Sequence, residues 1–487
     1  MRVHEKLLDG LRSYAALRLL TQGVSWLGTI YLIRVLDSRA FGRYGIALVV
    51  FNYLSVTYDG TLIEALVQRP PKSAAESRAV FTLLVGIGLV LAGATAALSA
   101  PLGALVGDES VAPLVSAVAL ALALTSFSVL PHASLAREMA FQRLAIVAAV
   151  QAICVTVAMV LLAWLGAGAG ALVAGLVVGA AVRLVLLNAA ACRLMLPTRH
   201  LSPAFGYLKF GGVLFADNLL WRWYTSLDTF LLGRWTGTTI LGFYSVAQQI
   251  AELPLEKIST VVNEVSLPAY AELCGDRTAA AGLMLETMRT HATIGFPVFW
   301  GLAVVAPYIV PIVFGPKWAL ATFPLIALSA IAPLRLIGSI ETPAMTGLGR
   351  PRVLLKSKLV IAPAMTLGLV LGCRLGGING AALAWLTAFP ICYAIAFRYV
   401  MQAAGITHQQ IFAVIRGPAA AAALMVALVL LWCRLAAMVS PSPVFGLITS
   451  VVAGAILYVG GLRLIDPGAY RLAHSRLGQF VGLRPSQ

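Results

Sequence analysis

The stretch "TIYLIRVLDSRAFGRYGIALVVF" at residues 29–51 returns 200 residues later as "TFLLGRWTGTTILGFYSVAQQIA" at residues 229–251. A shift of 200 without a gap aligns Leu20 with Leu220, Leu27 with Leu227, Thr29 with Thr229, Leu32 with Leu232, Arg34 with Arg234, Gly42 with Gly242, Tyr44 with Tyr244, Ala47 with Ala247 and Glu64 with Glu264. The Arg, Tyr and Glu matches carry more weight than the apolar ones, because apolar residues make up most of this chain. A duplicated hydrophobic unit is a common plan of membrane transporters, so the sequence predicts an internal repeat.

The composition excludes an ordinary soluble domain. Of the 487 residues, 60% are hydrophobic and 11% are charged, whereas soluble domains carry about 25% charged residues. Apolar runs of roughly 20 residues, each long enough to cross ~30 Å of hydrocarbon, recur along the whole chain. We predict an all-α polytopic membrane protein with about 14 spans (range 12–14), near residues 14–33, 44–68, 79–101, 111–133, 144–165, 168–190, 210–233, 239–262, 292–314, 318–340, 354–375, 378–400, 411–433 and 444–465.

The basic charge of the chain predicts its orientation in the membrane. With the N-terminus inside, 25 of the 35 Lys and Arg residues fall on the inner side or at the inner ends of spans, seven fall on the outer side and three lie deep within spans. This asymmetry follows the positive-inside rule, so both termini are expected in the cytoplasm. Membrane topology and the attraction of basic residues to anionic lipids then account for the net charge of +16. We therefore expect no nucleic-acid partner.

The connections on the outer side are short, which argues against a large catalytic loop. The six cysteines lack metal-ligand spacing, so we expect no metal or other cofactor. The polar stretch 191–209 resembles a linker between two halves. We therefore predict a six-helix lobe at 1–200, a second at 201–405, and an appended helix pair with a cytoplasmic tail at 406–487. Six spans per lobe make the repeat parallel, with its pseudo-two-fold axis along the membrane normal.

Several sequence runs resemble one family in their order and spacing. They are "LDSRAFGRYGIA" (36–47), "VQR" (67–69), "PHASLAREMAFQRLA" (131–145), "SLDTFLLGRWTGTTILGFYSVAQQIAELP" (226–254), "VNEVSLPAYAEL" (262–273), "GLGRPRVLLK" (347–356) and "GGINGAALAW" (376–385). Together they resemble Wzx-type polysaccharide and O-antigen flippases related to the colanic-acid flippase. These belong to the multidrug/oligosaccharidyl-lipid/polysaccharide exporter superfamily.

The resemblance implies a flippase and not an enzyme. The expected substrate is an undecaprenyl-pyrophosphate-linked oligosaccharide repeat unit, moved from the cytoplasmic to the periplasmic leaflet of the bacterial inner membrane by alternating access. Such units supply exopolysaccharide, O-antigen or capsule synthesis, so membrane lipids and a polysaccharide polymerase or co-polymerase are the expected partners. Two alternatives remain open: a cation-coupled multidrug or small-molecule exporter of the same superfamily, and a membrane glycan polymerase, which the short outer loops disfavour.

Ionisable residues within spans are the candidate substrate contacts, since they are costly in lipid and usually face the bundle interior. In "FADNLLWRWYTSLDTF" (215–230), steps of four, three and four place Asp217, Trp221, Tyr224 and Asp228 on one helical face. The residues predicted to bind substrate are Arg222, Arg335, Trp221, Tyr224 and Asn218, with the arginines suited to phosphate and the aromatic rings to sugar. For Arg222 the alternative is an interhelical ion pair, and for Arg335 it is snorkelling to an interface.

A second set of residues is predicted to couple or gate transport. The carboxylates in this set are Asp59, Asp217, Asp228, Glu252 and Glu256. Asp59 could bind a coupling H+ or Na+, and so could the pair Glu252 and Glu256. Asp59 could equally form a static link to Arg18 or Arg222. The repeat-related pair Glu64 and Glu264 is predicted at an inner gate, and the pair Arg34 and Arg234 at an outer gate.

Overall fold

The computed structural model describes residues 21–58, 63, 66, 71, 73–138, 140–191, 197–204, 206, 212–439 and 442–472. Every regular element in this part of the chain is helical, which confirms the all-α prediction. Residues 21–35 are helical. The α-helices that follow are α2 (Ser38–Ser55), α4 (Ala74–Val106), α5 (Val111–Ser126), α6 (Val129–Arg137), α7 (Phe141–Trp164), α8 (Ala169–Ala191), α10 (Gly212–Glu272), α11 (Arg277–Ile309), α12 (Thr322–Gly338), α13 (Glu341–Gly347), α14 (Pro351–Ala404), α15 (His408–Val439) and α16 (Pro443–Ile465).

Eight helices among the described residues are long and apolar enough to cross a membrane, and nine if α5 and α6 form one bent span. The long helices α10 and α14 each carry two of the predicted spans. A glycine with non-helical backbone angles separates the two halves, Gly237 in α10 and Gly377 in α14. The chain is therefore a polytopic helical membrane protein, while the larger number of 14 spans stays a prediction.

The predicted span 111–133 is not one straight helix. It consists of α5 and α6, which meet at an angle of 42°. At the bend the hydroxyl groups of Ser126 and Ser128 donate to the carbonyl oxygens of Ala123 and Thr125. Such side-chain bonds compete with the helical ladder, which explains why an apolar run that reads as a single span is broken here.

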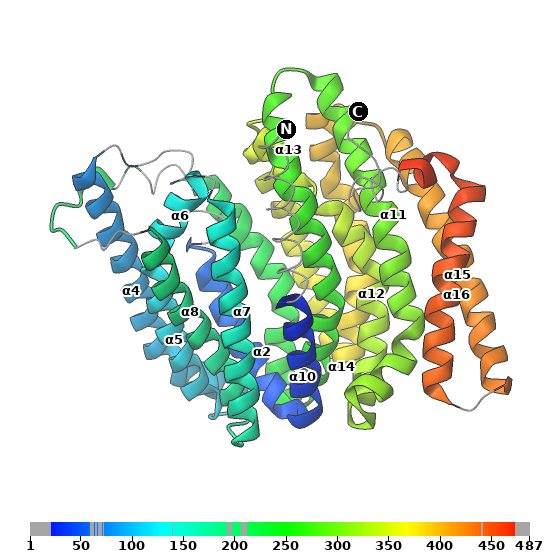
Figure 1. Ribbon diagram of the computed structural model, residues 1–487, viewed down its shortest axis with the longest axis horizontal. Coiled ribbons are helices and arrows are strands. Elements are labelled where there is room, and N and C mark those ends of the chain that lie inside the picture. Colours follow the sequence, from blue (N-terminus) through cyan, green and yellow to red (C-terminus); the bar gives the residue numbers. More distant parts are fainter. Residues whose placement is uncertain are drawn as a thin grey trace, which may run out of the picture. The chain divides into compact units, whose positions relative to one another are not determined.

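The chain divides into two compact units, Met1–Ser245 and Val246–Gln487, and the boundary falls inside α10. In unit 1, α4 packs against α5, α5 against α8, and α7 against α8 (Figure 1). The α4 N-terminus is capped by Ser73, whose side chain accepts from the backbone N–H of Glu76. Its C-terminus ends at Gly107, a residue with φ of 79°.

Unit 2 is built around α11, which contacts α12, α15 and α16 (Figure 1). The C-terminal pair α15 and α16 is fastened to α11 at one end by an ion pair between Arg289 and Asp466. Along its length the pair is also joined by Tyr458, whose hydroxyl donates to the Thr293 carbonyl at 2.7 Å. The appended helices are thus tied to the rest of their own unit.

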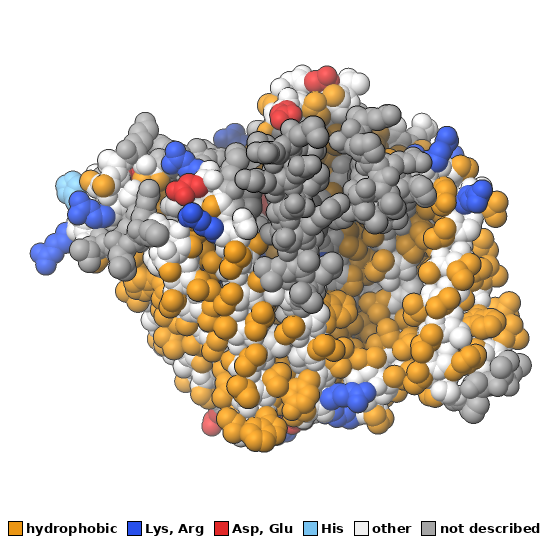
Figure 2. All heavy atoms as spheres, viewed as in Figure 1, with side chains coloured by type: hydrophobic (Ala, Val, Ile, Leu, Met, Phe, Trp, Pro, Cys, Tyr) orange, Lys and Arg blue, Asp and Glu red, His pale blue; other side chains and the backbone are white. Residues whose placement is uncertain are grey.

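The surface matches the membrane prediction. Figure 2 shows hydrophobic side chains over the middle of the helices, whereas the Lys, Arg, Asp and Glu side chains gather near the helix ends. Large apolar residues within the helices, such as Val90, Ile391 and Leu367, are 72%, 64% and 62% exposed. Lipid is the environment in which such exposure is favourable.

Candidate functional site

Helices α2 and α10 are in backbone contact at two glycines of the repeat. A Cβ on Gly42 would lie 1.7 Å from the Thr238 carbonyl oxygen, and a Cβ on Gly242 would lie 1.7 Å from the Ser38 carbonyl oxygen. Only glycine permits this backbone contact. Each glycine meets the residue that is equivalent, after the 200-residue shift, to the partner of the other.

Equivalent positions of the two repeats also touch one another directly. The Arg39 Nε donates to the Thr239 hydroxyl at 3.3 Å, and a Cβ on Gly45 would lie 2.7 Å from the Ser245 hydroxyl oxygen. Residues that meet their own equivalents lie at a local two-fold axis. The repeat predicted from sequence therefore has a geometric counterpart in the crossing of α2 and α10, all of it within unit 1.

A partly buried ion pair stabilises the contact between α2 and α10. Arg43 on α2 donates through Nε and Nη2 to both carboxylate oxygens of Asp108, at 2.7 and 3.0 Å. The Thr238 hydroxyl donates to Asp108 at 2.8 Å. Asp108 therefore joins α2, the α4–α5 connection and the second half of α10. We call Arg43, Asp108 and Thr238 the end clasp.

The end clasp shifts the pKa of its carboxyl group. Partial burial raises the pKa of Asp108, and the hydrogen bonds from Arg43 and Thr238 lower it by more in sum, so that it lies below its usual 3.8.

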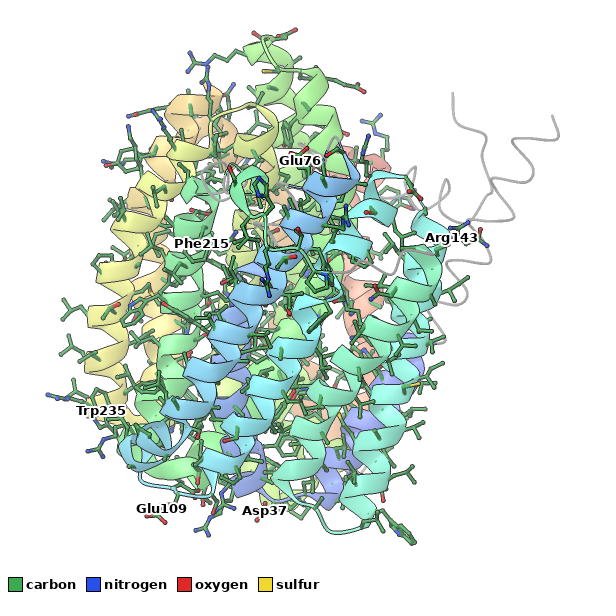
Figure 3. The ribbon with its side chains drawn as sticks, turned by 90° about the vertical axis from the view of Figure 1, so that its left-hand side faces the viewer. Asp37, Glu76, Glu109, Arg143, Phe215 and Trp235 are labelled. Atoms are coloured by element: carbon green, nitrogen blue, oxygen red, sulfur yellow. The ribbon has the colours of Figure 1, made fainter. Side chains whose placement is uncertain are left out.

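Figure 3 shows the neighbouring residues Asp37, Glu109 and Trp235 at one end of unit 1, and Glu76 toward the opposite end. The clasp thus closes one end of the helices in unit 1.

The two halves of α10 are bonded to each other across their break. Asp228, which is fully buried, accepts from the Tyr244 hydroxyl at 2.6 Å and from the Thr229 backbone N–H at 2.7 Å. Asp228 and Tyr244 lie on either side of Gly237. This predicted coupling residue therefore has a structural contact within unit 1, and its coupling role stays a prediction.

The rest of the predicted face in residues 215–230 is only partly open. Asp217 and Tyr224 are 4% exposed, whereas Trp221 is 37% exposed. The half-buried Arg222 places its guanidinium 4.7 Å from the centre of the Trp221 ring, a cation–π contact, and Asn218 is half-buried. Of the four residues that the sequence predicts on one helical face, Asp217, Tyr224 and Asp228 are buried, whereas Trp221 is exposed beside Arg222.

Three helices of unit 2 bring two predicted residues together. Arg335 on α12 donates to Glu252 on α10 at 3.0 Å. Its guanidinium also lies 4.7 Å above the ring of Trp385 on α14. Gln248, one turn before Glu252, donates to the same carboxylate oxygen at 3.3 Å. We call Gln248, Glu252, Arg335 and Trp385 the Arg335 cluster.

The remaining predicted residues are exposed or lie outside the described residues. Arg34, Arg234 and Glu256 are exposed. Asp59, Glu64 and the side chain of Glu264 lie outside the described residues, so the inner gate stays a prediction. Within the described ranges no group of three or more His, Cys, Asp or Glu side chains could hold a metal ion.

The sequence profile of the family described as polysaccharide biosynthesis protein matches residues 31–322, which is more than half of the chain. The chain belongs to the polysaccharide biosynthesis protein family. It is 26% identical over 393 residues to the lipopolysaccharide biosynthesis protein WzxC of Escherichia coli (strain K12), covering 79% of each chain. It is 27% identical over 460 residues to the succinoglycan biosynthesis transport protein ExoT of Rhizobium meliloti (strain 1021), covering 93% of this chain and 91% of ExoT.

Solved structures show the fold. The lipid II flippase MurJ in its inward closed conformation superposes with a TM-score of 0.75 at 11% identity, covering 93% of this chain and 98% of that one. An inward-facing multidrug resistance MATE family transporter of the MOP superfamily gives a TM-score of 0.57 at 14% identity, covering 79% and 95%. The resemblance drawn from sequence is confirmed, and the chain is a multi-pass membrane protein related to transporters and not to enzymes.

Sequence reasoning missed two groups that the fold of this family member assembles. Neither member of the Arg43–Asp108 pair was selected, although Arg43 lies beside Gly42 in the repeat. The buried pair Glu341 and Lys358, whose charged atoms are 3.8 Å apart, was also missed. A usable signal was present in the scarcity of carboxylates, since the chain has only 19 Asp and Glu residues and each invites a search for its cation.

Proposed function

We propose that this protein is a flippase that moves undecaprenyl-pyrophosphate-linked oligosaccharide repeat units from the cytoplasmic to the periplasmic leaflet of the bacterial inner membrane. The relatives WzxC and ExoT, named for lipopolysaccharide and succinoglycan biosynthesis, support a glycan substrate. The observation that carries the proposal is Arg335, a guanidinium held among apolar spans with a side chain only 12% exposed. A cation in that position suits an anionic ligand.

The chemistry of such a substrate explains the need for this arrangement. A pyrophosphate with an attached glycan cannot enter hydrocarbon unaided, because its desolvation costs far more than a single contact returns. Arg335 above Trp385 and Arg222 above Trp221 each present a charge beside an aromatic face. The charges suit the phosphates and the exposed ring of Trp221 suits the sugar, while the polyprenyl tail stays in lipid.

Transport by alternating access requires an end that opens and closes. The end clasp and the Gly42–Gly242 crossing are the closed contacts that we assign to the periplasmic end, in agreement with the inward orientation predicted for both termini. Opening there would release the repeat unit to a polysaccharide polymerase or co-polymerase. Coupling to H+ or Na+ is assigned to the carboxylates of α10.

The test is the leaflet distribution of lipid-linked repeat units in a strain that lacks the protein. The expected result is complete units on the cytoplasmic leaflet together with loss of surface glycan. Complete but unpolymerised units on the outer leaflet would instead indicate a polymerase. Normal surface glycan with increased sensitivity to cationic drugs would indicate the multidrug exporter.

Arg222→Ala is expected to abolish export of repeat units without lowering the amount of protein in the membrane. The reason is that an alanine leaves the phosphates without a counter-charge at Trp221. Arg416→Ala removes an exposed arginine on α15 and is the matched control, expected to export normally. Full export by Arg222→Ala would remove this residue from the substrate site.

A further inference from the structure

The Arg335 cluster contains an anion that belongs to the protein itself. Glu252 Oε1 accepts from Arg335 at 3.0 Å and from Gln248 at 3.3 Å. One carboxylate oxygen thus takes the charge-assisted bond that an oxygen of a phosphate ligand would take. A phosphate that accepts from this same Nη2 group must displace Glu252.

The two partners of this ion pair differ in how firmly they are held. Arg335 lies over Trp385, which is 1% exposed. Trp385 begins a ladder of aromatic rings on α14 that continues through Phe389, Tyr393 and Phe397, with successive ring centres 5.4, 5.6 and 5.2 Å apart. The Glu252 side chain is 29% exposed against 12% for Arg335. The guanidinium is therefore the fixed partner and the carboxylate the one with room to move.

A ligand displaces Glu252 only if it binds Arg335 more strongly than the Glu252 carboxylate does. An unpaired guanidinium in apolar surroundings is unfavourable, so Arg335 keeps its carboxylate until a better anion arrives. A lipid joined to sugar through one phosphodiester carries a single negative charge and offers Arg335 no more than Glu252 does. A pyrophosphate linkage carries two charges and can displace the carboxylate.

We propose that Glu252 is an internal competitor for Arg335 that makes the protein select pyrophosphate-linked over monophosphate-linked lipid carriers. This inference rests on the proposed function and assigns Glu252 a role in specificity. Glu252 leaves Arg335 when substrate binds and returns when substrate departs, so the cluster alternates between an internal and an external anion.

The experiment measures binding to purified full-length protein in nanodiscs. The two probes share one sugar and one short tail: farnesyl-pyrophosphoryl-glucose and farnesyl-phosphoryl-glucose. The unmodified protein is expected to prefer the pyrophosphate probe by about tenfold or more. Glu252→Gln is expected to bind the monophosphate probe about tenfold more tightly and to lose most of this preference. Arg335→Gln is expected to lose binding of both probes.

Two further variants keep the result interpretable. Glu272→Gln makes the same chemical change at an exposed carboxylate on the same helix and is expected to leave the preference unchanged. Gln248→Leu removes the second donor to Glu252, so it is expected to weaken the preference by about two- to threefold in the same direction, and it tests the idea even if Glu252→Gln does not fold.

The outcomes separate the inference from the proposed function. If the unmodified protein binds the pyrophosphate probe but Glu252→Gln and Gln248→Leu keep the same preference, Glu252 is a structural tie and the inference is overturned. If neither probe binds to the unmodified protein or to any folded variant, the proposed function fails and the inference fails with it.

Discussion

At the scale of single residues, Gly42 and Gly242 make the most demanding contacts. Alanine at either position would place a methyl carbon 1.7 Å from a backbone carbonyl oxygen, and no side-chain rotation can relieve that overlap. Each substitution is expected to destabilise the protein by about 1–3 kcal/mol, because the two helices must separate. The melting temperature in detergent measures the effect, and it should fall by similar amounts in the two variants.

The control is Gly86→Ala on α4, where an added Cβ meets nothing within 4 Å. It should melt at the temperature of the unmodified protein or slightly above, since alanine favours a helix. Equal melting temperatures for Gly42→Ala and Gly86→Ala would contradict the close crossing.

Asp108 gives a prediction about pH. Its pKa in the folded protein lies below the usual 3.8, so its contribution to stability is present above that value and is lost as the pH falls through the folded pKa. The melting temperature of Asp108→Asn should therefore lie below that of the unmodified protein by an amount that stays constant between about pH 8 and pH 5. The difference should shrink only below about pH 4.

Glu109→Gln, a change at the adjacent carboxylate, is expected to have little effect at any of these pH values. A difference for Asp108→Asn that already declined between about pH 7 and pH 5 would show that the folded pKa is raised and not lowered.

The sequence could identify individual candidate residues, but it could not identify which of them contact one another. Arg335 and Glu252 stood out because charge within an apolar span is costly. Their contact with each other and with Trp385 could not be derived, because the three residues lie on three helices and up to 133 positions apart in the printed sequence. Spacing along one helix shows which residues share a face, but the choice of partner on another helix depends on tertiary packing.

At the scale of elements, the break at Gly237 shapes α10. Its φ of 81° and ψ of 164° belong to a region that is essentially restricted to glycine. Gly237→Ala is expected to cost about 1–3 kcal/mol and to disturb the contact between Asp228 and Tyr244 across the break. The melting temperature checks the cost, with Gly282→Ala on α11, a site with open space around it, as the control. An unchanged melting temperature for Gly237→Ala would show that the break does not need glycine.

The helices themselves were largely predictable, and their breaks were not. Hydrophobic runs placed helices wherever the described residues carry a predicted span, since burial in lipid is decided locally along the sequence. The bend between α5 and α6 depends on serine hydroxyls that turn back to carbonyl oxygens. In α10 and in α14, two predicted spans are joined through a single glycine, Gly237 and Gly377 respectively. Average hydrophobicity is insensitive to both.

At the scale of the whole molecule, the predicted orientation can be tested at the ends of α4. Glu76 lies in its first turn and Glu109 lies just beyond its C-terminus. With the N-terminus in the cytoplasm, a cysteine at Glu109 should react with a membrane-impermeant maleimide added to intact cells. A cysteine at Glu76 should react only after the inner membrane is permeabilised. A background without other cysteines is the control, and the reverse pattern would invert the predicted topology.

The contacts between α2 and α10 constrain how two duplicated halves can differ. Halves that begin as copies place the same side chain twice wherever a position faces its own equivalent, so an arginine there would confront a second arginine. At such a position Arg39 meets Thr239, and Gly45 meets Ser245. A Cβ on Gly42 would lie close to its own equivalent, 3.1 Å from the Gly242 backbone nitrogen, as well as against Thr238, and both positions are still glycine. Divergence is thus required where two copies would bring like charges together, while identity is retained where the two backbones leave no room for a side chain.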